Sequence, residues 1–268
     1  MTPRRGPQYL LGVVACVVGL LMVWQWAARG QSSVVLPTPV DTLAALGRII
    51  GDGSLATELA LTLGRAALAT TLAFGFGVLL GWGEYRSVFV AGLTAPVRAV
   101  LQGLPPIVLI VVLVLWMGSD PAITIIVVST VMAPVIAAST ASALKCVDPL
   151  LRELGPALQL SRARRGLLIL APAALPPVLA TTGAVASGAV RVTVMAELLS
   201  APDGVGAAIA QNRTLLQTPE LFAWTAAIVV SALAVDLAIR AVLRRVTPPT
   251  AEAAAAVSPR SRPGIQTR

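Results

Sequence analysis

Six stretches of this 268-residue chain contain no charged side chain and are close to the length that crosses a bilayer. They cover residues 9–28, 66–83, 99–118, 121–144, 166–190 and 221–235. A helix of about 20 apolar residues spans the bilayer core, where the backbone must satisfy its own hydrogen bonds. The last stretch reaches this length by continuing through Asp236 to about residue 242. The expected fold is an all-α integral membrane protein with about six transmembrane helices.

The basic residues show how these helices are oriented. If the N-terminus is cytoplasmic, the inside segments carry 15 Lys and Arg residues and the outside segments carry 4. This is the positive-inside bias of multi-pass membrane proteins, and it also places the C-terminus in the cytoplasm. The net charge of +8 does not indicate a nucleic-acid partner, because the basic residues are scattered between apolar spans.

Several chemistries are excluded by composition. The chain has no histidine, which removes His-based metal sites and Ser-His-Asp catalysis, and we expect no metal site. Its single lysine, Lys145, follows Leu144 rather than glycine, so the phosphate-binding pattern GxxxxGK[ST] does not occur. We therefore expect no enzyme activity and no cofactor in this chain. Cys16 and Cys146 lie in distant segments, and no disulfide is expected between them.

The chain divides into three parts. Residues 1–57 hold the first helix, about 9–28, and an outer segment in which Leu43, Leu46, Ile49 and Ile50 recur at helical spacing. Residues 58–245 hold helices at about 59–83, 99–118, 121–144, 167–195 and 221–243, with a cytoplasmic loop at 145–166. Residues 246–268 are rich in Pro, Ala, Ser and Arg, which predicts a disordered cytoplasmic tail.

Two details of the spans remain to be decided. Arg4 and Arg5 ahead of the first apolar run also fit a cleaved secretory signal, but its length and Trp24 and Trp26 near the cleavage position favour an uncleaved helix. Pro105 and Pro106 must break or kink the third span, either as a packed kink or as a hinge.

The second span has glycines at 75, 77, 81 and 83, which allow close helix packing.

The cytoplasmic loop predicts a pair of short amphipathic helices. Asp148 followed by Pro149 is a helix start, and Leu150, Leu154, Ala157 and Leu158 then share one face, with Glu153 more exposed. Gly155–Pro156 is expected to break the helix, because proline disfavours helical geometry at the residue before it. Ser161 can cap a second helix that begins at Arg162. The exposed leucines either rest on lipid headgroups or fill a groove of a partner protein.

This loop resembles a known signature. The stretch "VDPLLRELGPALQLSRARRGLLILAPAALPPVL" (147–179) is similar to the signature loop in the permease subunits of bacterial ATP-binding-cassette (ABC) importers. The likeness continues in "LPTPVDTL" (36–43), "LPPIVLIVVLVLWMG" (104–118), "AELLSAPDGVGAAI" (196–209) and "LLQTPELFAW" (215–224), and it is strongest to the sulfonate, taurine and nitrate branch. The resemblance implies the type I importer permease fold for 58–245, in the bacterial inner membrane.

The resemblance also implies partners. The loop would be a coupling helix that docks on a separate ATPase, which binds ATP and Mg²⁺. A secreted solute-binding protein would deliver the solute, and a second permease copy, as a homodimer in the lipid membrane, would complete the path.

Individual positions match the family signature or depart from it. The expected coupling residues are Asp148, Pro149, Leu150, Glu153, Leu154, Gly155, Leu158, Ser161 and Arg162. Leu154 and Gly155 replace two alanines of the family, and Gln159 replaces its glycine. We therefore expect Gly155–Pro156 to supply the break four residues early.

Few charges are available to handle a solute in the membrane. Arg191 lies in the fifth span with no acid within one helical turn; it either faces the translocation path and favours an anion, or pairs with Glu197 or snorkels. Glu197 either contacts the path or a binding protein, or caps the next segment. Asp236 and Arg240 form an i, i+4 pair.

We expect a permease for a small anionic solute. The alternatives are a different nutrient and an ion-gradient-driven transporter, which usually carries several membrane acids.

Overall fold

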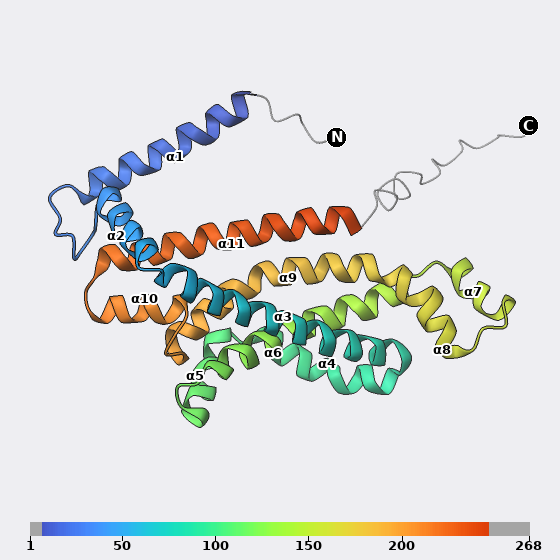
Figure 1. Ribbon diagram of the computed structural model, residues 1–268. Helices are drawn as coiled ribbons and strands as arrows, with labels where there is room; N and C mark the ends of the chain where they lie inside the picture. The colour runs from blue at the N-terminus through green and yellow to red at the C-terminus, as the bar shows by residue number, and fades with distance from the viewer. Residues whose placement is uncertain (1–6, 247–268) are drawn as a thin grey trace, which may run out of the picture.

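The computed structural model describes residues 7–246, and every regular element in that range is a helix (Figure 1). The elements are α1 (Pro7–Ala28), α2 (Pro39–Gly51), α3 (Ser54–Arg86), α4 (Val88–Gly103), α5 (Pro106–Met117), α6 (Pro121–Lys145), α7 (Pro149–Ala157), α8 (Arg162–Arg165), the π-helical turn η1 (Gly166–Leu170), α9 (Ala171–Ser200), α10 (Val205–Thr214) and α11 (Thr218–Val246). Arg4, Arg5 and the tail from 247 lie outside the described residues.

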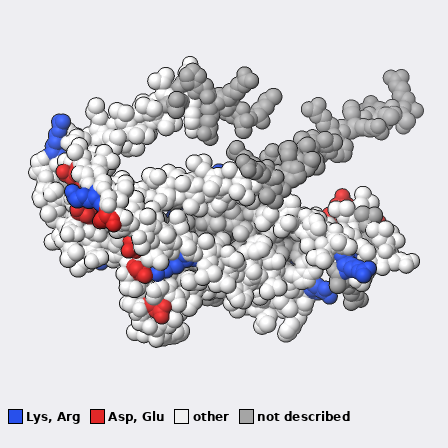
Figure 2. Space-filling view, viewed as in Figure 1, with Lys and Arg blue, Asp and Glu red and all other residues white. Residues whose placement is uncertain are grey.

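Five helices are long and apolar enough to cross a membrane, and there are six if the bent pair α4–α5 is counted as one span. The five contain Leu11–Ala28, Ser54–Arg86, Pro121–Lys145, Gly166–Ser200 and Thr218–Leu243. The long helices run in one common direction, with α2 and α10 at one end of the molecule and α7 and α8 at the other (Figure 1). Charged side chains on the visible face gather mostly toward these two ends (Figure 2). The prediction of about six spans in an all-α fold is confirmed.

The third span differs from its prediction as a single helix over 99–118. The chain forms α4 and α5, which meet at an angle of 96°. Leu104 and Pro105 are extended between them, at the Pro105–Pro106 pair that was expected to break the helix. Helix α4 begins at Val88, well before the predicted start, because the charge of Arg98 does not end the span. The Arg98 guanidinium contacts the buried Glu84 carboxylate at 2.6 Å and so packs α4 against α3.

Helix α3 packs most extensively against α6, and two of its glycines make this contact possible. A Cβ atom added at Gly77 would lie 2.7 Å from the Cβ of Ile136, and one at Gly81 would lie 2.5 Å from the carbonyl oxygen of Ala137. Gly75, in contrast, faces open space. The predicted close packing of the second span is therefore confirmed, but only Gly77 and Gly81 face α6.

The outer amphipathic helix is present as α2. Thr38 and Asp41 form a capping box at its start, in which each side chain accepts a hydrogen bond from the other's backbone N–H. The buried face differs from the expected one: α2 buries Thr42, Ala45 and Ile49, whereas the predicted Leu43 and Ile50 are exposed. Ala45 is fully buried in a cluster that includes Trp224 of α11 and Val205 of α10.

Candidate functional site

The predicted coupling segment forms helix α7 and protrudes at one end of the molecule (Figure 1). Asp148 caps it as expected: its carboxylate accepts a hydrogen bond from the backbone N–H of Leu150 at 2.8 Å, and Pro149 begins the helix. The side chains of Leu150 and Leu158 are 71% and 63% exposed, and Glu153 is also exposed. Helix α7 therefore presents apolar side chains that no described residue covers.

The expected break at Gly155–Pro156 is wrong. Helix α7 runs through both residues to Ala157, and Leu154 lies within it. The clash that disfavours helix before proline involves the Cβ of the preceding residue, and Gly155 has none. The chain turns instead at Gln159, whose φ of 50° lies in the left-handed region that favours glycine. The turn thus keeps the position where the family signature has its glycine, although this chain has glutamine there.

The segment leads directly into the fifth span. The Ser161 hydroxyl accepts a hydrogen bond from the Arg164 backbone N–H at 3.3 Å, and Arg162 begins α8 as expected. From Arg162 the helix continues through the π-helical turn η1 into α9 without a break. At the start of η1, a Cβ on Gly166 would lie 2.9 Å from the Trp82 ring, so α3 packs directly on this turn.

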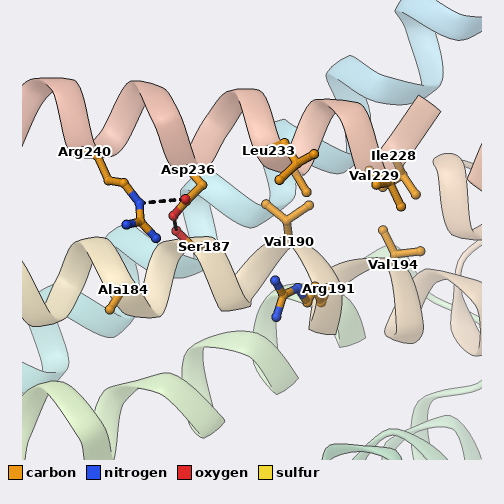
Figure 3. Close-up of a pocket in the computed structure, with 11 residues that line it drawn as sticks. Ala184, Ser187, Val190, Arg191, Val194, Ile228, Val229, Leu233, Asp236 and Arg240 are labelled. Atoms are coloured by element: carbon orange, nitrogen blue, oxygen red, sulfur yellow. Dashed lines mark hydrogen bonds and ion pairs between the residues drawn. The ribbon is translucent and has the colours of Figure 1, made fainter. Parts of the chain in front are cut away.

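Arg191 lines a cavity between α9 and α11 (Figure 3). The cavity measures about 600 Å³, and most of its wall is apolar. Asp236, on α11, accepts hydrogen bonds from the Ser187 hydroxyl and from Arg240 Nε, each at 2.7 Å. The i, i+4 pairing of Asp236 with Arg240 is confirmed. Arg191 donates no hydrogen bond and forms no ion pair within the described range 7–246.

Glu197 does not pair with Arg191 and lies away from this cavity, fully buried where α3, α9 and α10 meet. One carboxylate oxygen accepts a hydrogen bond from Arg65 at 2.9 Å. The other accepts from the Thr62 hydroxyl at 2.7 Å and from the Gly206 N–H at 3.2 Å. Glu197 therefore caps α10, which is one of the two roles that the sequence left open.

The partners of Glu197 were missed by the sequence analysis. Arg65 lies within α3, as the helix predicted at about 59–83 requires, and also contacts the Asp203 carboxylate at 2.5 Å. Glu58, one turn before Thr62, accepts a hydrogen bond from the Gly204 N–H. These groups are 132 to 146 residues apart in sequence, so helical spacing gives no sign of them.

The helices, the broken third span and the protruding α7 define an integral membrane permease of the type I ABC importer fold. Two solved structures share this fold. A chain of the MetNI methionine ABC transporter in an inward-facing conformation matches with a TM-score of 0.64 and 17% identity, over 72% of this chain and 96% of that one. A chain of an amino acid ABC transporter with histidines matches with a TM-score of 0.60 and 15% identity, over 74% and 94%.

Sequence relatives identify the family. Residues 73–248 match the family described as "Binding-protein-dependent transport system inner membrane component", and the chain belongs to it. The taurine transport system permease protein TauC of Escherichia coli K12 is 29% identical over 85% of this chain and 86% of its own. The putative aliphatic sulfonates transport permease protein SsuC of Bacillus subtilis 168 is 27% identical over 76% and 75%. The chain is therefore a multi-pass inner membrane transport permease.

Proposed function

We propose that this chain is the membrane subunit of an ATP-driven importer and that, with a second copy, it encloses the path of a small anionic solute. A separate ATPase, which binds ATP and Mg²⁺, drives transport from the cytoplasmic side, where both termini lie. A solute-binding protein delivers the solute at the opposite face. The family membership supports this proposal, and six spans in one chain are few to enclose a path in lipid alone.

The exposed apolar side of α7 is the observation that carries the coupling role. Leu150 lies in the first turn of α7 and Leu158 directly follows its last residue, and α7 contacts the rest of the described chain mainly through η1. Exposed leucines beside a charged residue, here Leu150 and Leu151 beside Glu153, are typical of a surface that enters a groove of a partner. We therefore assign docking of the ATPase to α7.

Substitution of these leucines tests the coupling role. Leu158→Asp, and separately Leu150→Asp, should reduce copurification of the ATPase and ATP-driven uptake in proteoliposomes at least about tenfold, because a charge enters an apolar contact. Leu215→Asp changes another exposed leucine, beside α10 at the opposite end, and should leave copurification of the ATPase unchanged. If both α7 variants still copurify with a working ATPase, α7 is not the docking helix.

The anionic character of the solute is supported by Arg191. A guanidinium without an ion-pair partner in a membrane span is costly, and it is stabilised when it faces water or an anion. The aliphatic sulfonates named for the relative SsuC carry the same negative charge. Arg191→Ala should lower ATP-driven uptake of an organic anion at least about tenfold. Unchanged uptake and unchanged ionic selectivity would contradict this role.

A further inference from the structure

The cavity between α9 and α11 is polar toward the end of the molecule that carries α7 and apolar toward the end that carries α10 (Figure 1 and Figure 3). Ser187, Asp236 and Arg240 gather at one end, and Val194, Ile228 and Val229 line the other (Figure 3). Arg191 lies between these two groups along α9. A solute in the cavity therefore meets the Arg191 guanidinium between the Asp236–Arg240 ion pair and an apolar wall.

Asp236 is the only acid that lines this cavity among the described residues. Its two carboxylate oxygens are both used, one by the Ser187 hydroxyl and the other by Arg240. The side chain of Asp236 is 29% exposed and that of Arg240 is 67% exposed, and the two form an ion pair at 2.7 Å. The charge of Asp236 is neutralised at close range, and Arg191 is the uncompensated charge that remains.

This arrangement discriminates between solutes by charge pattern. A monoanion with an apolar body can pair with Arg191 and place its carbon chain against the valines. A zwitterion of the same shape also brings an ammonium group, which must leave water without a free carboxylate to accept it, and this desolvation opposes binding. A small inorganic anion would leave the apolar wall in contact with water.

We infer that Arg240, by masking Asp236, makes the α9–α11 cavity a site that selects organic monoanions over zwitterions. The inference rests on the proposed function, because it assigns the selectivity for a small anionic solute to one site in the permease itself. Arg240 acts through Asp236 and is a positioning residue. Arg191 is the residue that contacts the anionic group.

Two solutes of nearly equal shape test this selectivity. Propane-1-sulfonate and 2-aminoethanesulfonate differ in that a methyl group of the first is an ammonium group in the second. Their binding to the full chain in phosphatidylcholine nanodiscs can be measured by titration calorimetry. We expect propane-1-sulfonate to bind at least about tenfold more tightly, and Arg191→Gln to weaken it at least about tenfold. Equal affinity of the wild-type chain for the two solutes would overturn the inference.

Arg240→Gln is the decisive variant, because it should increase the binding of 2-aminoethanesulfonate, and a misfolded protein would only lose binding. With Asp236 unmasked, the cavity holds a carboxylate and the Arg191 guanidinium, and binding of 2-aminoethanesulfonate should rise at least about tenfold relative to propane-1-sulfonate. Arg240→Lys keeps a cation and should retain the wild-type preference. Arg213→Gln, on α10, is the matched control and should change nothing. An unchanged preference in Arg240→Gln would refute the masking role.

An anionic lipid headgroup offers the same charge as the solute, so nanodiscs that contain phosphatidylglycerol form a second arm. Propane-1-sulfonate binding that persists in them supports a solute site, and binding that they abolish would assign the cavity to lipid and overturn the inference. Failure of the proposed function is seen separately, as absence of a copurifying ATPase and of ATP-driven uptake, because the binding measurement needs no ATPase.

Discussion

Gln159 shows how one residue can keep a backbone conformation that its own side chain opposes. At φ 50° the residue is left-handed, which costs an L-amino acid about 1 kcal/mol relative to glycine. The turn that follows α7 requires this conformation, since Ser161 two residues later must cap α8. The position of the turn is therefore set by the capped helices on either side.

Gln159→Gly should stabilise the α7–α8 turn by about 0.5–1 kcal/mol, because glycine adopts the left-handed region without a steric cost. Hydrogen–deuterium exchange of the α7 amides should slow accordingly in the purified full chain. Gln211→Gly makes the same substitution in the middle of α10 and should speed local exchange there. Faster exchange in α7 of Gln159→Gly would contradict the left-handed assignment.

Glu197→Gln should lower the free energy of unfolding by about 3 kcal/mol, because Arg65 would lose a charged partner in a buried site. Thermal unfolding of the purified chain measures this. Glu220→Gln is the matched control: Glu220 pairs with Arg48, whose side chain is 63% exposed, and the loss should stay below about 1 kcal/mol. Equal losses would mean that the buried network does not stabilise α10 as described.

At the scale of single elements, the α3–α6 contact depends on which glycines face it. Gly81→Ala should destabilise the fold by about 1–3 kcal/mol. The added Cβ would lie 2.5 Å from the carbonyl oxygen of Ala137 and 2.6 Å from the Cβ of Thr140, both in α6. Gly75→Ala on the same helix meets open space and should be neutral or slightly stabilising. Thermal unfolding of the two variants compares them directly, and similar midpoints would refute this packing.

The all-α class and the approximate number of membrane spans could be predicted from sequence, because hydropathy and capping act locally. The cap of α7 by Asp148, the start of α8 at Arg162 and the Asp236–Arg240 pair involve near neighbours, and all three are found. The start of α4 and the site of Glu197 could not be predicted. Both depend on ion pairs between separate helices, which neutralise charges that otherwise indicate the end of a span.

For the whole molecule, the two cysteines test the proposed orientation. Cys146 is exposed just after α6, at the end that carries α7, whereas Cys16 lies within the apolar α1. A membrane-impermeant maleimide should label Cys146 in inside-out vesicles and not in right-side-out vesicles. Cys146→Ser should abolish that labelling. Labelling of Cys146 from the outside would reverse the cytoplasmic assignment of α7.

The uninterrupted helix from α8 through η1 into α9 has a mechanical consequence. Its far end is held at Glu197, and Trp82 packs on it at Gly166. The distance along the axis from η1 to Glu197 is about 45 Å at 1.5 Å per residue. If this helix tilts about its contact with Trp82, each degree of tilt moves the end near Glu197 by about 0.8 Å.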